Sequence, residues 1–445
     1  MTHEGPNWIA PREGQDWRDH EVLAAVDWLK GFVPRAEMER RLDAARARLT
    51  RAGELWRNGE GADAYDPADA AAWWILQGES FGDGREWTAP DMLARTVPYL
   101  TRLGRELDRI RAIPGAEERA ERMMNGGRAA VEPAIYELLV ALAWSRHGWT
   151  TTFVPEVRGG PRSPDLDVAR PRRHWAVECK RVTRTAYAEN ERAHGLALAT
   201  PVHRLSERLG RSVVVRVAYK AELQDIPADY LEARVAEALE GPLQWDDAVS
   251  AGRLTPSNWR LVREVMDRDD VYYGSSRMIE LASGRYDDQA DHSFSGRWRP
   301  ADGRPFYAST LYHCSVVTWI STARQAQLLK AQHFRRLIAD AEGQLPDDRP
   351  GVVHVGFETM NGHASERLRH LRNVVEARLY TPRNPRFRWV YGNYFAPERT
   401  TARMETWALN ESMAPYRIGR HRTAWPLPDH MLVSDEEDSQ PGMHF

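Results

Sequence analysis

The sequence predicts an α/β protein in which a mixed sheet is flanked by helices, with a helical domain before it and an extension after it. Residues 165–168 alternate polar and apolar side chains, as half-buried strands do, and residues 175–180 are apolar except at positions 178 and 180. Residues 132–144 form an apolar run of helical length, with Pro133 in the first turn, where its missing N–H costs nothing. Helical and strand patterns continue to alternate downstream, which is typical of an α/β fold.

In the first 125 residues apolar side chains recur at helical spacing, and no catalytic motif is recognisable. Val22, Val26 and Leu29 recur at helical intervals. We therefore expect residues 1–125 to form a helical accessory domain that positions substrate or mediates dimerisation. The stretch 123–127, which contains two glycines, marks the expected boundary.

Two acidic groups and a lysine fall on the adjoining extended segments. Because side chains alternate between the faces of a strand, Glu178 and Lys180 point one way while their apolar neighbours point the other. The same parity places Asp165 and Asp167 together. A short basic turn joins the two segments, and we expect a hairpin.

The upstream helix carries one acidic side chain among apolar ones. Glu137 lies on its apolar face, where a carboxylate needs a partner such as a cation or a metal ion. Glu132 could serve instead, or either glutamate could cap the helix.

These residues resemble the PD-(D/E)XK nuclease superfamily, the fold of many restriction endonucleases and DNA-repair nucleases. The resemblance covers about residues 130–219 and continues more weakly over about 310–358. It implies a restriction-endonuclease-like core over residues 126–360, with an insertion at about 224–305. We expect the strands at 212–219 and 311–320 to belong to that core.

The resemblance assigns a role to each residue of the motif. Asp165 and Glu178 would ligate one or two Mg²⁺ or Mn²⁺ ions, helped by the backbone carbonyl of Cys179. Lys180 would orient or activate the attacking water. Glu137 would correspond to the acidic residue that many members carry on the preceding helix.

A second aspartate departs from the family pattern. Asp167 is the alternative to Asp165 as metal ligand, although the Pro-Asp pair that contains Asp165 is the family's usual form. Two carboxylates and a carbonyl suit Mg²⁺, which prefers oxygen ligands and keeps several waters. Only four of the 61 basic residues are lysines, yet Lys180 occupies the motif position.

Two polar residues near a predicted helix at about 323–343 also come into question. Gln344 and Lys330 could face the site, but ordinary exposed polar positions are the stronger interpretation.

Nucleic-acid contacts are expected from arginines near the motif. The net charge of −3 excludes a uniformly basic binder, so local patches must decide phosphate binding. The expected contact residues are Arg172, Arg173, Arg181 and Arg184. In the C-terminal extension, residues 361–432, arginines interleave with aromatics, which suits either nucleic-acid contacts or a solvated strand. Residues 433–445 are acidic, and we expect a disordered tail.

Several classes of protein are excluded or disfavoured. Two cysteines cannot form a disulfide framework or a four-cysteine zinc site, and we expect Cys179 and Cys314 to be buried thiols. No Gly-Lys pair exists, so there is no P-loop. The amino terminus lacks the features of a signal peptide, and no apolar run approaches 18 residues. We expect a cytoplasmic protein without membrane contact.

The resemblance therefore predicts a metal-dependent endonuclease that acts on DNA in a bacterial restriction, repair or phage-defence role. A catalytically silent nucleic-acid-binding or scaffold subunit and an RNA-directed nuclease are the alternatives. A homodimer or an activating partner subunit is compatible with the predicted nuclease.

Overall fold

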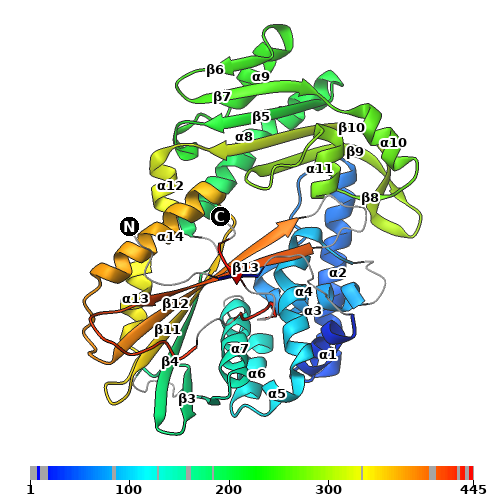
Figure 1. Cartoon of the computed structure of the whole chain (residues 1–445). Helices are drawn as coiled ribbons and strands as arrows, with labels where there is room; N and C mark the ends of the chain where they lie inside the picture. The colour runs from blue at the N-terminus through cyan, green and yellow to red at the C-terminus, as the bar shows by residue number, and fades with distance from the viewer. Residues whose placement is uncertain are drawn as a thin grey trace.

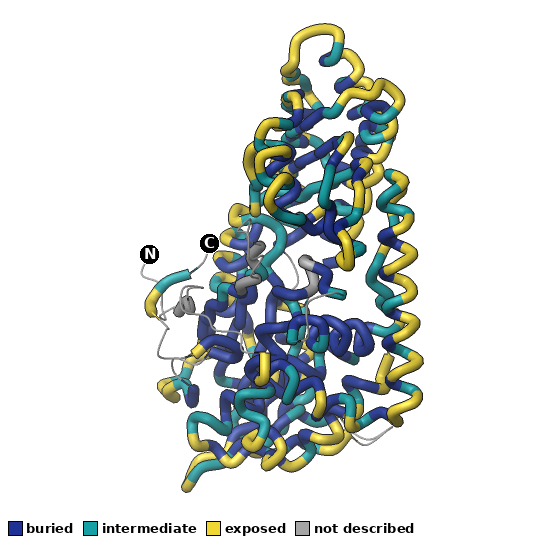
Figure 2. Tube along the Cα trace, turned by 90° about the vertical axis from the view of Figure 1, so that its right-hand side faces the viewer, coloured by how far each residue is buried: buried dark blue, intermediate teal, exposed yellow. Residues whose placement is uncertain are grey.

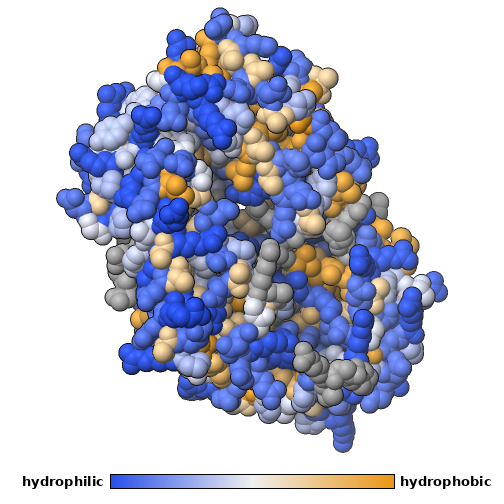
Figure 3. Space-filling view, turned by 180° about the vertical axis from the view of Figure 1, so that it is seen from behind, coloured by the Kyte–Doolittle hydropathy of each residue, from blue (hydrophilic) through white to orange (hydrophobic). Residues whose placement is uncertain are grey.

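The computed structural model describes residues 8–10, 19–82, 87–127, 130–156, 162–182, 185–331, 334–399, 407–427, 431–435 and 440–443. Over these residues the chain is a mixed α/β protein with two mixed sheets. The first sheet lies in the lower half of the view in Figure 1 and the second at its top. Buried stretches occur at both levels, and exposed segments lie at the periphery of both (Figure 2). The surface is hollowed between the two levels, with hydrophobic residues at part of the rim (Figure 3).

The first sheet has eight strands. In spatial order these are β14 (Gln440–Pro441), β1 (Trp8–Ala10), β13 (Trp407–Arg417), β12 (Phe387–Arg399), β11 (Gly351–Glu358), β4 (Arg173–Val182), β3 (Leu166–Arg170) and β2 (Thr150–Phe153). Strand β11 is parallel to both β4 and β12, and the other pairs are antiparallel. All eight residues of β11 are buried, as expected for a central strand covered on both faces.

Helices cover both faces of this sheet. On one side lie α1 (Asp19–Lys30), α2 (Arg35–Arg57), η1 (Pro67–Asp69), α3 (Ala70–Gly82), α4 (Pro90–Arg105), α5 (Leu107–Arg111), α6 (Ala116–Asn125) and α7 (Val131–Arg146). On the other lie α12 (Arg324–Lys330), α13 (Phe334–Glu342) and α14 (His363–Leu379). The predicted apolar helix is α7, whose burial on nearly every side explains why residues 133–144 are apolar apart from Glu137. Tyr99 of α4 contacts Phe395 of β12, so the N-terminal helices share a core with the sheet.

The second sheet is built almost entirely from the chain between β4 and β11. Its path is β6 (Gln244–Asp246), β7 (Ser250–Pro256), β5 (Val213–Tyr219), β10 (Arg304–Ser321) and β8 (Val271–Tyr272), and β9 (Asp291–Ala301) also pairs with β10. One face packs on α8 (Ala186–Leu209), η2 (Leu223–Asp225) and α9 (Tyr230–Glu240), and part of the other on α10 (Trp259–Met266) and α11 (Ser276–Ser283).

The placement of β5 and β10 corrects the sequence prediction. Both were expected beside the β3–β4 hairpin, but they pair with each other in the second sheet. The parallel neighbour of β4 is β11 instead. The apolar run of β5 correctly predicts a buried strand, but such a run does not indicate which of the two sheets the strand joins.

The C-terminal segment also differs from the prediction. Strands β12 and β13 are part of the first sheet, and the aromatic side chains of Tyr391, Tyr394 and Phe395 are fully buried. Residues 433–435, expected to be disordered, are held in place. Arg102 donates to the carbonyls of Val433 and Ser434, at 2.9 and 2.5 Å. The acidic composition predicted disorder, because composition does not show that the buried guanidinium of Arg102 binds backbone carbonyls of this segment.

Cys179 and Cys314 are free and buried, as predicted. None of the described helices has both the length and the apolar character that a membrane crossing requires.

A buried polar chain links α7, β11 and β12. The indole Nε1 of Trp144 donates to His354 Nε2 at 3.1 Å, and the OH of Tyr136 donates to Asn393 Oδ1 at 2.8 Å. His354 Nδ1 lies 3.3 Å from the same Asn393 oxygen. Because Nε2 accepts, the neutral ring carries its proton on Nδ1.

Acid should destabilise the protein through His354. Burial lowers the pKa of His354 to about 3, whereas an unfolded histidine titrates near about 6.5. Below pH ~6.5 the unfolded chain gains a proton that the folded protein does not, so stability falls with pH down to about 3 and is unaffected above ~6.5. We expect a loss of about 2–3 kcal/mol from this group between pH 7.5 and 4.5.

Urea unfolding of wild type and His354→Gln at both pH values measures this loss. The variant should lose less stability on acidification by that amount. Equal losses in the two proteins would contradict the assignment.

Candidate functional site

The β3–β4 hairpin brings the acidic motif together. Leu166 pairs with Val177, and the two-residue turn ends at Arg172, which has a φ of 63°. Continuing the register by one step sets Asp165 opposite Glu178. The backbone N–H of Cys179 donates to Asp165 Oδ2 at 2.7 Å. Burial raises the pKa of Asp165, and this hydrogen bond opposes the rise.

Glu178 is the most buried member of the motif, with an exposed fraction of 1%. Its Oε1 accepts from Lys180 Nζ and from Gln344 Nε2, each at 2.5 Å. Its Oε2 is buried and has no hydrogen-bond partner among the described residues. Burial, followed by the charge of Asp165, raises the pKa of Glu178 well above its usual range. A buried carboxylate oxygen without a partner is costly unless a ligand completes it.

Lys180 lies on the same face and remains partly open to solvent. Burial alone would lower the pKa of Lys180, but the charge of Glu178 and the hydrogen bond to it outweigh burial and raise the pKa. The ammonium is therefore held protonated beside Glu178.

Glu137 reaches the site from α7 but is neutralised by two arginines. Arg122 Nη2 donates to Glu137 Oε2 at 2.5 Å, and Arg119 Nε lies 3.3 Å from the same oxygen. Burial, followed by the charge of Asp165, raises the pKa of Glu137 to about 7. Arg119 and Arg122 also bind Glu156, so α6 brings two positive charges to the acidic cluster. Neither arginine was predicted from the sequence, where their i,i+3 spacing on a helix is the only signal.

Asp167 has a different partner. Arg349 donates to Asp167 Oδ1 from Nη2 at 2.7 Å and from Nε at 3.0 Å, and His174 lies 3.5 Å away. The chain thus engages Asp167 in an ion pair and leaves Asp165 beside Glu178. This geometry favours Asp165 of the two aspartates.

The structure does not bring the expected nucleic-acid contacts to the site. Arg172 and Arg173 are exposed at the hairpin turn, and Arg173 lies five strand residues, or about 17 Å, from Glu178. The side chain of Arg181 is only 4% exposed and stacks over Phe395 at 4.9 Å, on the face opposite Lys180. Strand parity explains the position of Arg181, since odd-numbered residues of β4 face the core that the sheet shares with the N-terminal helices. Arg184 lies outside the described residues.

The donor set fits a hard divalent cation. Asp165 and Glu178 offer carboxylate oxygens, one of them without a partner, and Cys179 adds a nearby carbonyl. Within the described ranges, no group of three or more His, Cys, Asp and Glu side chains is arranged to hold a metal ion. A cation here would therefore keep several water ligands, as Mg²⁺ commonly does.

Comparisons with protein-family models, curated proteins and solved structures find no match to this chain. Any function must therefore be argued from the site itself. Gln344 is part of the site, because its Nε2 donates to Glu178, although the sequence favoured an exposed position. Lys330 is not part of the site, because it pairs with Glu191 at 2.5 Å.

Proposed function

We propose that this chain is a nuclease of the PD-(D/E)XK type, which hydrolyses phosphodiester bonds of DNA with Mg²⁺ or Mn²⁺. The observation that carries the proposal is the buried Oε2 of Glu178, which has no partner in the described part of the chain and lies next to Asp165 and Lys180. Carboxylate pairs with a neighbouring lysine are suited to metal-assisted phosphodiester hydrolysis.

The order of elements supports the same proposal. Helix α7 is followed by the antiparallel strands β2, β3 and β4, and β11 then joins β4 in parallel. This arrangement resembles the superfamily core, with the second sheet inserted between β4 and β11. The inserted part is longer than the sequence indicated, since it includes α8, β5 and β10.

Each residue has a definite task in the proposed reaction. Asp165 and Glu178 would hold the cation, which when bound polarises the phosphoryl group and lowers the pKa of its water. Lys180 places a positive charge beside the reacting phosphate and orients the attacking water. Gln344 fixes the carboxylate of Glu178 by hydrogen bonding, so it acts as a positioning residue. Glu137, held by Arg119 and Arg122, tunes the charge around Asp165.

The decisive test compares two neighbouring aspartates. We expect wild-type protein to cut supercoiled plasmid with Mg²⁺ or Mn²⁺ and not with EDTA. Asp165→Asn should lower the rate at least about a hundredfold, because a ligand is lost. Asp167→Asn, a matched control, should keep the rate within about threefold, since it breaks only a partly exposed ion pair with Arg349.

Substrate class is tested with labelled single-stranded DNA and RNA of matched sequence. Faster cutting of RNA would favour the RNA-directed alternative. Mn²⁺ uptake without any cleavage would favour the silent subunit, and equal activity of both aspartate variants would sink the assigned site.

A further inference from the structure

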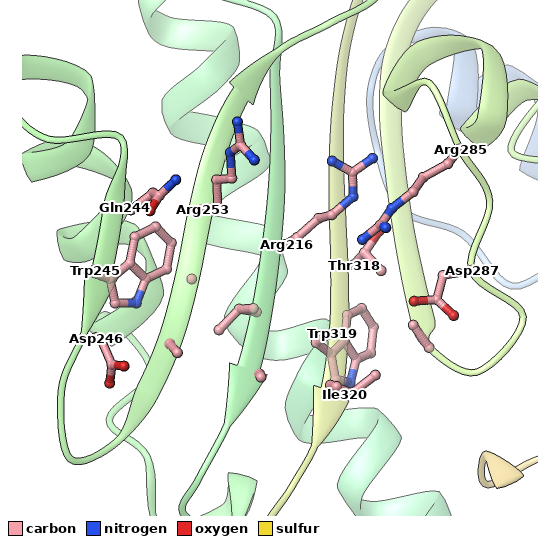
Figure 4. A pocket seen from close by; sticks show the side chains of 15 residues that line it. Arg216, Gln244, Trp245, Asp246, Arg253, Arg285, Asp287, Thr318, Trp319 and Ile320 are labelled. Atoms are coloured by element: carbon pink, nitrogen blue, oxygen red, sulfur yellow. The ribbon is translucent and has the colours of Figure 1, made fainter.

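A row of polar side chains crosses the second sheet on the face opposite α8 and α9. Gln244, Arg253, Arg216 and Thr318 are direct cross-strand partners on β6, β7, β5 and β10. Arg216 and Arg253 thus stand side by side, where like charges repel. Arg285 extends toward this row from the loop before β9 (Figure 4).

The charge of Asp287 raises the pKa of Arg216 and so offsets only part of this repulsion. Over residues 185–331, which are described without a gap, neither Arg216 nor Arg253 nor Arg285 forms a salt bridge with any described carboxylate. Arg216 is fixed by a hydrogen bond to the Ser283 carbonyl at 2.7 Å. Burial, and then the charges of Arg285 and Arg253, lower the pKa of Arg216. The cluster is therefore incomplete without an anion.

Two acidic residues border the same region without neutralising it. Asp246 is paired with Lys220, a cation outside the row. Asp287 accepts a hydrogen bond from the backbone N–H of Gln289 at 3.1 Å.

The row borders a groove of about 600 Å³. Its next row along the strands has Ala251 and Ala218, whose small side chains allow a ligand to approach the sheet, and Ile320, which is 38% exposed. Helices α10 and α11 pack over the preceding row, around Val214 and Val316, and α11 ends at Ser283, whose carbonyl accepts from Arg216. The face is thus half covered and half open.

We propose that this arginine groove (Arg216, Arg253 and Arg285) binds the phosphate backbone of a DNA duplex, as a contact region separate from the carboxylate site. The inference rests on the proposed action on DNA, and it adds a substrate-binding surface that the motif does not contain. Guanidinium groups bind phosphate in a bidentate manner, and the small side chains of Ala218 and Ala251 leave room beside Arg216 and Arg253.

The dimensions suit a strand of DNA. From β6 to β10 the groove crosses three strand spacings, or about 14 Å. Along the duplex axis each strand places one phosphate about every 3.4 Å, so this width corresponds to roughly four base-pair steps of a duplex whose axis runs across the strands. A row of arginines across the strands can follow such a line of charges.

Binding is measured by fluorescence anisotropy of a labelled duplex in EDTA, so that cleavage plays no part. We expect the double variant Arg253→Ala, Arg285→Ala to bind at least about tenfold more weakly at 0.1 M salt, and the slope of log affinity against log salt to fall by about 2. The matched control, Arg260→Ala with Arg268→Ala, removes two exposed arginines of the same sheet unit and should bind like wild type. The charge-conserving double variant Arg253→Lys, Arg285→Lys should keep the salt slope of wild type.

The outcomes separate this proposal from the nuclease proposal. Equal binding by the groove variant and the control would overturn the groove, whatever the cleavage assay shows. No binding of wild type to duplex would overturn it as well, and tighter arginine-dependent binding of RNA would overturn the assignment to DNA. Loss of binding in the groove variant alone supports it even if no metal yields cleavage.

Discussion

Glu178→Gln should abolish metal-dependent cleavage, with a fall in rate of at least about a hundredfold, while the protein stays folded. The amide keeps the size of the side chain and an acceptor for Lys180 and Gln344, but it removes the charge that would hold a cation. Because burial already raises the pKa of Glu178, losing this charge also relieves a desolvation cost. Lys180 reaches solvent, so it tolerates the loss of its partner, and we expect stability without metal to change by less than about 1 kcal/mol.

Thermal unfolding with and without Mn²⁺ separates this effect from misfolding. At a concentration about a hundred times the Kd, metal should stabilise wild type by about 2.7 kcal/mol and leave Glu178→Gln unchanged. Glu207→Gln, on the second sheet unit, is the control and should behave like wild type. Undiminished cutting by Glu178→Gln would remove Glu178 from the mechanism.

Arg102→Leu should lower the free energy of unfolding by about 3–5 kcal/mol. The side chain of Arg102 is 4% exposed and bonds the carbonyls of Val433 and Ser434. From the other side, the carboxylate of Glu411 accepts the N–H groups of residues 432–434 at 2.6, 3.0 and 2.9 Å. Leucine fills part of the volume but leaves two buried carbonyls without their donor, and it removes the cation that pairs with Glu106 and Asp435, each at 2.9 Å.

Arg109 provides the matched control. It also pairs with Glu106, at 3.0 Å, but its side chain is 46% exposed, so Arg109→Leu should cost less than about 1 kcal/mol. Urea unfolding measures both variants, and limited proteolysis should release the C-terminal segment first in Arg102→Leu. Similar losses for the two variants would show that the buried contacts contribute little.

Local sequence patterns predicted the structure correctly where residues that are close in the chain are also close in space. Strand parity and a short hairpin are enough to place Asp165 beside Glu178, and apolar spacing is enough to locate α7. The expected contact of Arg181 with nucleic acid did not take this parity into account, and the structure places its side chain over Phe395, on the face opposite Lys180.

Contacts between distant segments could not be predicted in this way. No local sequence pattern indicates that β5 pairs with β10 and β7 rather than with β4, because strand pairing depends on how whole layers pack. The arrival of Arg119 and Arg122 at Glu137 depends on how α6 docks on α7. Residues 433–435 are ordered by groups more than 300 positions away in the chain, at Arg102.

The bond from Gln344 to Glu178 joins residues 166 positions apart, and the whole second sheet is threaded between them. A chain emerging from the ribosome therefore displays Asp165, Glu178 and Lys180 long before Gln344 and β11 exist to complete their surroundings. Such distant pairings form late and slowly. Assembly of the centre is thus tied to synthesis of the chain through β11, and a chain that stops earlier carries the motif without the framework that orients it.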